Sequence, residues 1–233
     1  MNYLQLVQRL RQETNYANTG PVAVTGQTGD HARAVSWIAD AYTELQNRHP
    51  WRWLREGFTL TTVSGDGEYA ASDAISDSST TSISRFSAWH ADDAFNPPKC
   101  YLQSAGEGAA YWLTYIPWEQ YRTIYDIGTY SDASPSHITV DPDDNLVLGP
   151  APDDTYVIKG EYHRSPQTLS ANGYSPLITS QFHMIIVYLA MEDAGFFDAA
   201  DDIIMRGRRK CRRLLRQLEI NQGPVLRMAG PLA

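Results

Sequence analysis

Apolar side chains recur at helical spacing near the start of the chain. Within residues 3–13, the apolar positions are Tyr3, Leu6, Val7 and Leu10. Spacings of three and four residues place side chains on one side of an α-helix, so this segment is predicted to be an amphipathic helix. Asn2 precedes it and is a candidate N-cap, because its side-chain oxygen can accept a hydrogen bond from the first turn.

A second helix is predicted over residues 31–48, after a polar, turn-rich linker over residues 14–29. Its apolar stripe consists of Ala34, Ile38, Ala41 and Leu45, broadened by Val35 and Tyr42. Asp30 is the expected N-cap. The helix is expected to stop near His49, because Pro50 disfavours a helical conformation in the residue before it.

The pattern changes to short strands and turns from Trp51 to about Ser165. Phe58, Leu60 and Thr62 alternate with polar residues, as in a half-buried strand. Further strands are predicted over residues 83–89, 99–103, 137–140, 146–148 and 155–163, with a short helix over 118–125. Short strands between regular turn signals are typical of a β-sandwich or barrel.

Helical patterns return after residue 165. Residues 180–194 are apolar almost all round, which predicts a central helix. Gly195 is expected to end it, and Asp198 is expected to cap a further helix that runs to about Asn221.

The order of elements predicts an α+β fold. We expect a four-helix bundle formed by the N- and C-terminal helices, with an inserted β-sandwich or barrel-like domain. The expected divisions are N-terminal bundle helices at 1–55, the β insert at 56–165, C-terminal bundle helices at 166–221 and an extended tail at 222–233.

Charge is distributed unevenly along the chain, whose net charge is −8. Residues 56–165 carry 5 basic and 17 acidic side chains, whereas residues 166–233 carry 8 basic and 6 acidic ones. Because acidic side chains repel phosphates, the middle of the chain is not expected to wrap DNA tightly.

The last predicted helix carries seven cations on about three turns. They are Arg206, Arg208, Arg209, Lys210, Arg212, Arg213 and Arg216. Like charges four residues apart repel each other. Two interpretations stay open: a solvated face favoured by the helix dipole, or a partner surface that binds either acidic protein or nucleic-acid phosphate. The acidic insert of a neighbouring subunit is one candidate partner.

Residues with catalytic or metal-binding chemistry form no recognisable motif. Asp141, Asp143 and Asn145 resemble the opening of a calcium loop, but Leu146 and Pro152 replace its glycine and its bidentate acid, which favours a β-turn. The six histidines have no pair at metal-ligand spacing, and the two cysteines are expected to be reduced thiols. We expect no cofactor, no metal and no enzymatic activity.

The tail after Asn221 contains two Gly-Pro pairs, which stop a helix from continuing. It also carries spaced apolar side chains, which predict a segment that docks in extended form in a groove of a partner. The candidate docking residues are Val225, Leu226, Arg227, Met228 and Leu232.

Seven segments, in order along nearly the whole chain, resemble the adaptor proteins of tailed bacteriophages. They are VTGQTG at 24–29, IADAYTELQNRHPWRWL at 38–54, CYLQSAG at 100–106, HITVDP at 137–142, NLVLGP at 145–150, YHRSP at 162–166 and FHM at 182–184. The resemblance implies a helical bundle that carries a β domain, and it brings no catalytic residue.

This resemblance also implies a structural role as a head-to-tail connector. The expected assembly is a homo-oligomeric ring, dodecameric to match the portal, that extends the DNA channel and offers a platform for tail attachment. The implied partners are the portal protein, a tail or nozzle protein, and double-stranded DNA that passes without sequence-specific binding. No membrane partner is expected; the implied location is the virion neck, after synthesis in the host cytoplasm.

The alternative function is that of a nucleic-acid-binding accessory protein that uses the basic C-terminal helix. Steep salt dependence of DNA affinity would favour it. If the cations instead form an assembly interface, charge reversal at Arg209, Arg212 and Arg213 is expected to weaken assembly more than folding.

Overall fold

The computed structural model describes residues 1–15, 20–127 and 130–223. The chain divides into two compact units. The first, here the helical unit, combines Met1–Trp53 with Pro166–Ala233, and the second, here the β unit, is Leu54–Ser165. The α+β class expected from the sequence is confirmed, since described helices and described sheets both occur.

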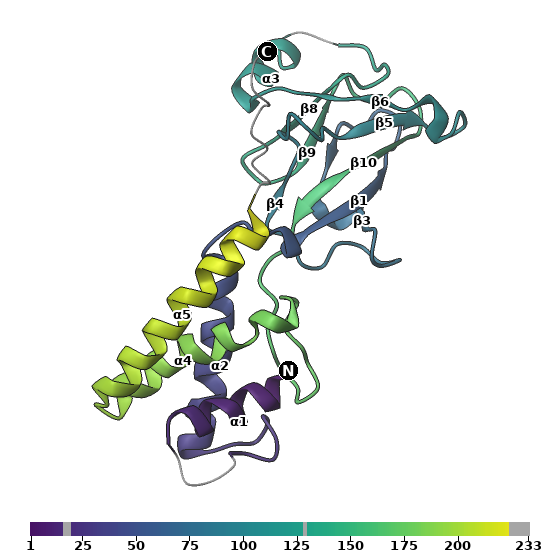
Figure 1. Ribbon diagram of the computed structural model, residues 1–233. Coiled ribbons are helices and arrows are strands. Elements are labelled where there is room, and N and C mark those ends of the chain that lie inside the picture. Colours follow the sequence, from purple (N-terminus) through teal and green to yellow (C-terminus); the bar gives the residue numbers. More distant parts are fainter. Residues whose placement is uncertain (16–19, 128–129, 224–233) are drawn as a thin grey trace, which may run out of the picture. The chain divides into compact units, whose positions relative to one another are not determined.

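Four α-helices make up the described part of the helical unit (Figure 1). They are α1 (Tyr3–Glu13), α2 (Gly29–Asn47), α4 (Met184–Phe197) and α5 (Asp201–Gln222). Helix α4 contacts each of the other three. The prediction of a central helix, based on apolar side chains around its whole circumference, is therefore confirmed.

The start of α1 follows the prediction closely. The Asn2 side chain accepts a hydrogen bond from the Gln5 backbone N–H at 2.9 Å, and the Gln5 side chain accepts one from the Asn2 backbone N–H at 2.9 Å. This reciprocal pair satisfies two N–H groups that have no partner inside the helix. Helix α1 ends at Glu13, as expected.

Helix α2 begins earlier than expected, and its predicted cap is wrong. Thr28 occupies the N-cap position, and Asp30 lies inside the first turn. There the Asp30 carboxylate pairs with Arg33 at 2.8 Å instead of capping the helix.

Two predictions at the junction of α4 and α5 are also wrong. Gly195 does not end α4, which continues to Phe197. A Cβ at Gly195 would stand 2.6 Å from Ile204 Cγ1, so the glycine allows close packing between the helices. Asp198 caps no N-terminus; it follows the last residue of α4, and α5 begins only at Asp201.

The β unit contains two open sheets. The larger has the order β3-β1-β10-β5-β6, with β4 also paired to β10, and the smaller has the order β2-β9-β8-β7. The strands of the larger sheet are β1 (Arg55–Thr61), β3 (Ile75–Ser76), β4 (Ala88–Trp89), β5 (Lys99–Leu102), β6 (Tyr111–Trp112) and β10 (Tyr156–His163). Those of the smaller sheet are β2 (Glu68–Tyr69), β7 (Thr114–Tyr115), β8 (His137–Val140) and β9 (Leu146–Gly149). Barrel-like closure is wrong for the described strands, since neither sheet closes.

A single hydrophobic cluster includes side chains from both sheets. Phe58, Cys100 and Ile158 come from the larger sheet, and Ile138 and Leu148 come from the smaller one. Helix α3 (Trp118–Tyr125) lies beside the smaller sheet, where the Tyr121 hydroxyl donates to the Leu148 carbonyl at 3.1 Å. The short helix predicted over 118–125 is therefore confirmed.

The strand predicted over residues 83–89 forms only at its end, as β4. Strand β10 pairs with β1 along one edge. Along its other edge, β5 pairs with residues 156–159, so that β4 can pair only further along, opposite Tyr162 and His163. Ile83 is nevertheless buried in the hydrophobic cluster. Apolar character thus predicted burial here correctly, but pairing was limited by the neighbouring strand.

Candidate interaction surface

Helix α5 has one face packed into the helical unit. Its buried residues are Ile203, Ile204, Gly207, Cys211 and Leu218. A Cβ at Gly207 would stand 3.0 Å from the Tyr188 carbonyl oxygen of α4, so the two helices lie very close at this point. This packing fixes which side of α5 turns toward solvent.

Three of the seven predicted interface cations have partners within the helical unit. The Arg206 guanidinium donates to the Glu13 carbonyl, Lys210 Nζ lies 3.2 Å from Glu13 Oε2, and Arg208 pairs with Glu192. The hydrogen bond to Glu192 raises the pKa of Arg208 above its ordinary value. These three side chains therefore tie α5 to α1 and α4.

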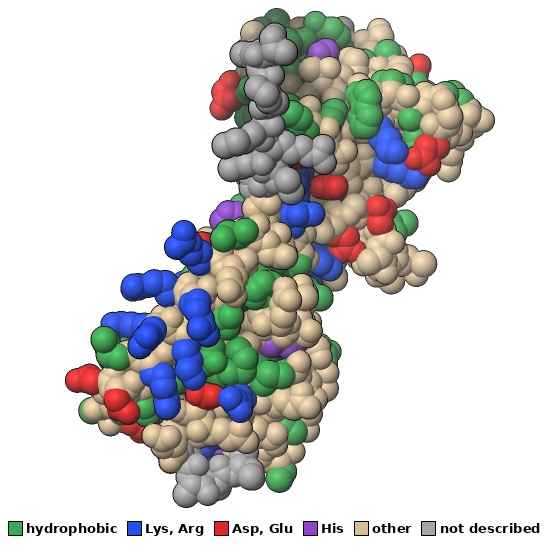
Figure 2. All heavy atoms as spheres, in the orientation of Figure 1, with side chains coloured by type: hydrophobic (Ala, Val, Ile, Leu, Met, Phe, Trp, Pro, Cys, Tyr) green, Lys and Arg blue, Asp and Glu red, His purple; other side chains and the backbone are tan. Residues whose placement is uncertain are grey.

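The other four cations form the exposed group that we call the arginine face. They are Arg209, Arg212, Arg213 and Arg216. Within the described residues, none of them has a hydrogen bond or an ion pair. Figure 2 shows the Lys and Arg side chains gathered along α5. Four cations are thus left free to meet a partner.

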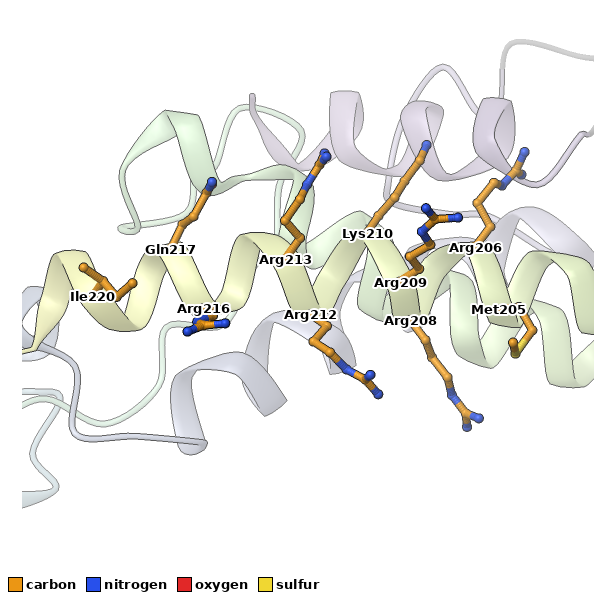
Figure 3. Close-up of a pocket in the computed structure, with 10 residues that line it drawn as sticks. All are labelled: Met205, Arg206, Arg208, Arg209, Lys210, Arg212, Arg213, Arg216, Gln217 and Ile220. Carbon is orange, nitrogen blue, oxygen red and sulfur yellow. The ribbon is translucent and has the colours of Figure 1, made fainter.

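Two apolar side chains flank the arginine face. Met205 is 67% exposed and Ile220 is 74% exposed. Between them, the long side chains spread apart, so that Arg213 and Arg212 point to opposite sides of the helix and leave an open hollow along its surface (Figure 3). The surface therefore combines positive charge with apolar contact area, as protein interfaces often do.

Both cysteines are buried and free. Burial raises the pKa of Cys211, which lies on the packed side of α5, to about 11, and burial also raises the pKa of Cys100. Since the thiolate is the reactive form, both thiols are poor nucleophiles.

The β unit carries a surface of opposite sign, which the sequence pattern did not reveal as one patch. We call it the acidic edge, and it consists of Asp66, Glu68, Asp132, Asp141, Asp143, Asp144, Asp153 and Asp154. All are exposed except the half-buried Asp141. In the described part of the chain, no Lys or Arg pairs with any of them.

Edge strand β2 brings these carboxylates together. Glu68 Oε1 accepts a hydrogen bond from Asn145 Nδ2 at 2.8 Å, and Asn145 also donates to Asp141. At the other end of β2, the Gly65 N–H donates to the Pro152 carbonyl at 2.8 Å, which places the turn of Asp66 beside Asp153. Residues from four separate segments therefore follow one side of the small sheet.

The turn over residues 141–145 forms as predicted. Asp141 Oδ1 accepts hydrogen bonds from the backbone N–H groups of Asp143 and Asn145, each at 2.8 Å. Its side chain is thus used to close the turn. Within the described ranges, no three His, Cys, Asp or Glu side chains come together as a possible metal site.

The fold brings together one pair of histidines that their sequence spacing did not suggest. The rings of His90 and His163 lie 5.9 Å apart between centroids. Burial is the largest cause that lowers both pKa values, followed by Arg55 for His90 and by His90 for His163. Two neutral imidazoles without a third ligand are a weak basis for a metal site.

The predicted docking tail, Val225, Leu226, Arg227, Met228 and Leu232, lies outside the described residues. No described helix is both long and apolar enough to cross a membrane.

Comparison with known proteins identifies the family of the chain. A search of curated proteins returned no match. The sequence model of the family described as SU10 adaptor protein matches residues 1–228, which is nearly the whole chain and includes both units. The chain therefore belongs to the SU10 adaptor protein family, a family of phage head-to-tail adaptors.

Proposed function

We propose that the protein is a subunit of a homo-oligomeric ring, dodecameric to match the portal, in the neck of the virion. The ring binds the portal on one side, offers a platform to a tail or nozzle protein on the other, and extends the DNA channel. Within it, the four helices act as a bundle that carries a sandwich-like β insert. The observation that carries the proposal is the family match over residues 1–228.

The arginine face supports a role in assembly. Exposed cations contribute little to the stability of a single subunit. At an interface, by contrast, charges set the orientation of the partners and raise the rate of encounter. Four arginines without an intramolecular partner are therefore better suited to assembly than to folding. We assign all seven α5 cations to the subunit or portal interface, with Arg206, Arg208 and Lys210 positioning the helix.

The acidic β unit supports passage of DNA without retention. Leu54–Ser165 contains 17 acidic and 6 basic side chains, and a ring multiplies this excess. At physiological salt such charge repels phosphate over about 8–10 Å. A duplex in the channel would then slide past the β units instead of binding to them.

The tail remains part of the proposal as a portal-docking segment. Truncation after Asn221 removes Val225, Leu226, Met228 and Leu232, which supply its apolar contacts. The shortened protein should melt like the full chain but attach poorly to portal-filled heads. Normal attachment would assign the whole joint to the helices.

The experiment that tests the ring is electron microscopy of purified cognate portal mixed with the protein. We expect a second ring stacked on the portal, with twelve copies per portal, and a matching shift in sizing chromatography. The protein without portal serves as the control, because a ring interface can require the portal as a template. Absence of any higher assembly with portal would contradict the proposal.

A second candidate function is nucleic-acid binding by the arginine face, because four unpaired arginines also suit phosphate oxygens. Its signature is an affinity for DNA that falls steeply with salt, by about 0.9 in the logarithmic slope for each phosphate contacted. Replacement of Arg209 and Arg213 by Glu would then reduce the slope by roughly 2. If the wild-type protein has no measurable affinity at low salt, this function is excluded.

A further inference from the structure

We propose that the arginine face of one copy docks on the acidic edge of the β unit of the neighbouring copy. This inference rests on the proposed ring and names the contact that joins its subunits. Each copy then contributes one basic surface and one acidic surface. A contact between two different surfaces repeats from copy to copy and closes into a ring when the rotation allows it.

The arginine face has no partner for its charge within the described residues. Arg209 lies four residues from Arg213, and Arg212 lies four residues from Arg216. At this spacing like charges repel along the helix. Among the described residues, Glu13 and Glu192 pair with Lys210 and Arg208, and no acid, including Asp201, Asp202 and Glu219 of α5 itself, forms an ion pair with the arginine face. An anionic surface from another molecule would relieve the repulsion.

The acidic edge, in turn, has no cation of the β unit to pair with among the described residues. Five of the six cations in the β unit pair with carboxylates outside the acidic edge, and Arg85 donates to the Ser165 carbonyl. The eight edge carboxylates, on the described chain, therefore have no cation of their own unit. The two surfaces carry opposite charges that no ion pair within the described part of either unit neutralises.

The arginine face, taken with its two apolar flanks, is longer than the strands of the small sheet. Met205 and Ile220 are fifteen residues apart on α5, which corresponds to about 22 Å along a helix. Strands β8 and β9 contain four residues each, or about 13 Å. The acidic edge extends beyond them into the turns at both ends. A helix of this length that lies beside β2 would therefore also reach carboxylates in the turns.

Apolar side chains favour a protein partner over a nucleic acid. Met205 and Ile220 are largely exposed at the two ends of the arginine face, and Val63 is 62% exposed beside the turn of Asp66. A carboxylate-bearing protein surface with an apolar neighbour can bury both kinds of group, whereas a phosphate backbone gives Met205 and Ile220 nothing apolar to contact. Arginine also matches carboxylates through two parallel hydrogen bonds.

Complementary charge reversal tests the contact. One variant combines Arg209→Glu with Arg213→Glu, and a second combines Asp132→Lys with Asp143→Lys. The four side chains are exposed and accept or donate no hydrogen bond within the described structure. The control variant, Asp92→Lys with Glu119→Lys, makes the same change in charge at two exposed acids outside the acidic edge. Thermal melting of each variant verifies the fold.

Assembly on cognate portal is measured for each variant, for their equal mixture and for one chain that carries all four substitutions. For each reversed variant alone, we expect the amount of protein bound to the portal to fall by about tenfold or more. The control variant should bind in the same amount as wild type. The mixture should recover, because alternating copies restore opposite charges at every contact. The chain with all four substitutions should load by itself.

The outcomes separate this inference from the ring itself. If wild type loads on the portal but the mixture does not recover, the ring stands and the proposed contact is wrong. If wild type fails to load, the proposed function is wrong. Loss of DNA affinity together with unchanged loading would overturn the contact in favour of nucleic-acid binding.

Discussion

In the β unit, every cation has a partner and carboxylates are left over, whereas in the helical unit cations are left over on α5. Arg55, Lys99, Arg122, Lys159 and Arg164 each form an ion pair inside the β unit. Arg209, Arg212, Arg213 and Arg216 form none within the described residues. Among the described residues, the charges left without a partner in the β unit are therefore carboxylates, whereas the arginine face of the helical unit is positive.

This difference indicates that paired charges and unpaired, exposed charges have different roles. Paired charges such as Arg164 and Glu56 are partly buried and belong to the fold. Unpaired exposed charges contribute little to stability and are available for association. The comparison would be contradicted by an arginine of the arginine face that proves essential for folding, or by a paired charge of the β unit that controls assembly.

The largest expected effect concerns the core on which the acidic edge is built. Phe58 is 1% exposed and packs edge-on against Trp89, with 4.7 Å between ring centroids. Phe58→Ala should lower the free energy of unfolding by about 3–5 kcal/mol, because it removes contacts and leaves a cavity. Urea denaturation measures the loss. The matched surface variant Asp143→Lys should stay within about 0.5 kcal/mol of wild type.

A smaller effect is expected for the ion pair between Glu56 and Arg164, whose atoms lie 3.0 Å apart. Their side chains are only 11% and 20% exposed. Glu56→Gln should cost about 1–3 kcal/mol, since it removes the negative charge that pairs with the Arg164 guanidinium. Portal loading should be unchanged at a temperature where the variant remains folded. A loading defect without a stability defect would break the comparison.

The same pair predicts an acid dependence. Burial raises the pKa of Glu56, but hydrogen bonds from Ser76 and Ser78 and the charge of Arg164 outweigh it, so the pKa lies below its ordinary 4.5. Ionised Glu56 therefore stabilises the fold above pH 4.5, and this contribution is lost as the pH falls through the lower folded-state value. Glu56→Gln should lose less stability than wild type over that window in pH-dependent melts.

The smallest expected effect has the opposite sign. Arg209→Gln with Arg212→Gln and Arg213→Gln removes repulsion along α5, at about 0.2–0.5 kcal/mol for each pair four residues apart. The subunit should melt at the same temperature or slightly higher, yet load poorly on the portal. Equal losses of melting temperature and loading would show that the arginines serve the fold.

The sequence predicted the features that depend on residues close together in the chain. Asn2, the apolar circumference of α4 and the turn closed by Asp141 could all be recognised locally. The predicted end of α4 at Gly195 was wrong because the sequence does not distinguish a glycine that ends a helix from one that permits close packing. The contact with Ile204 of the next helix shows that Gly195 is of the second kind. The limited length of β4 likewise depends on β5, which is distant in sequence.

The candidate surface was only half predictable. A run of seven cations is visible in the sequence, but Glu13 and Glu192 separate the paired members from the free ones only in three dimensions. The acidic edge could not be predicted as a patch, because strand pairing assembles it from residues 66–68, 132, 141–144 and 153–154.

Zero-length carbodiimide crosslinking of the portal-bound ring tests the central contact most directly. Arg209→Lys with Arg213→Lys keeps the charge and supplies amines that couple to adjacent carboxylates. Mixing isotope-labelled and unlabelled copies allows mass spectrometry to identify links between different chains. The proposed contact predicts interchain links from the introduced lysines to carboxylates of the acidic edge. Links confined to single chains, or interchain links only to acids outside the acidic edge, would contradict it.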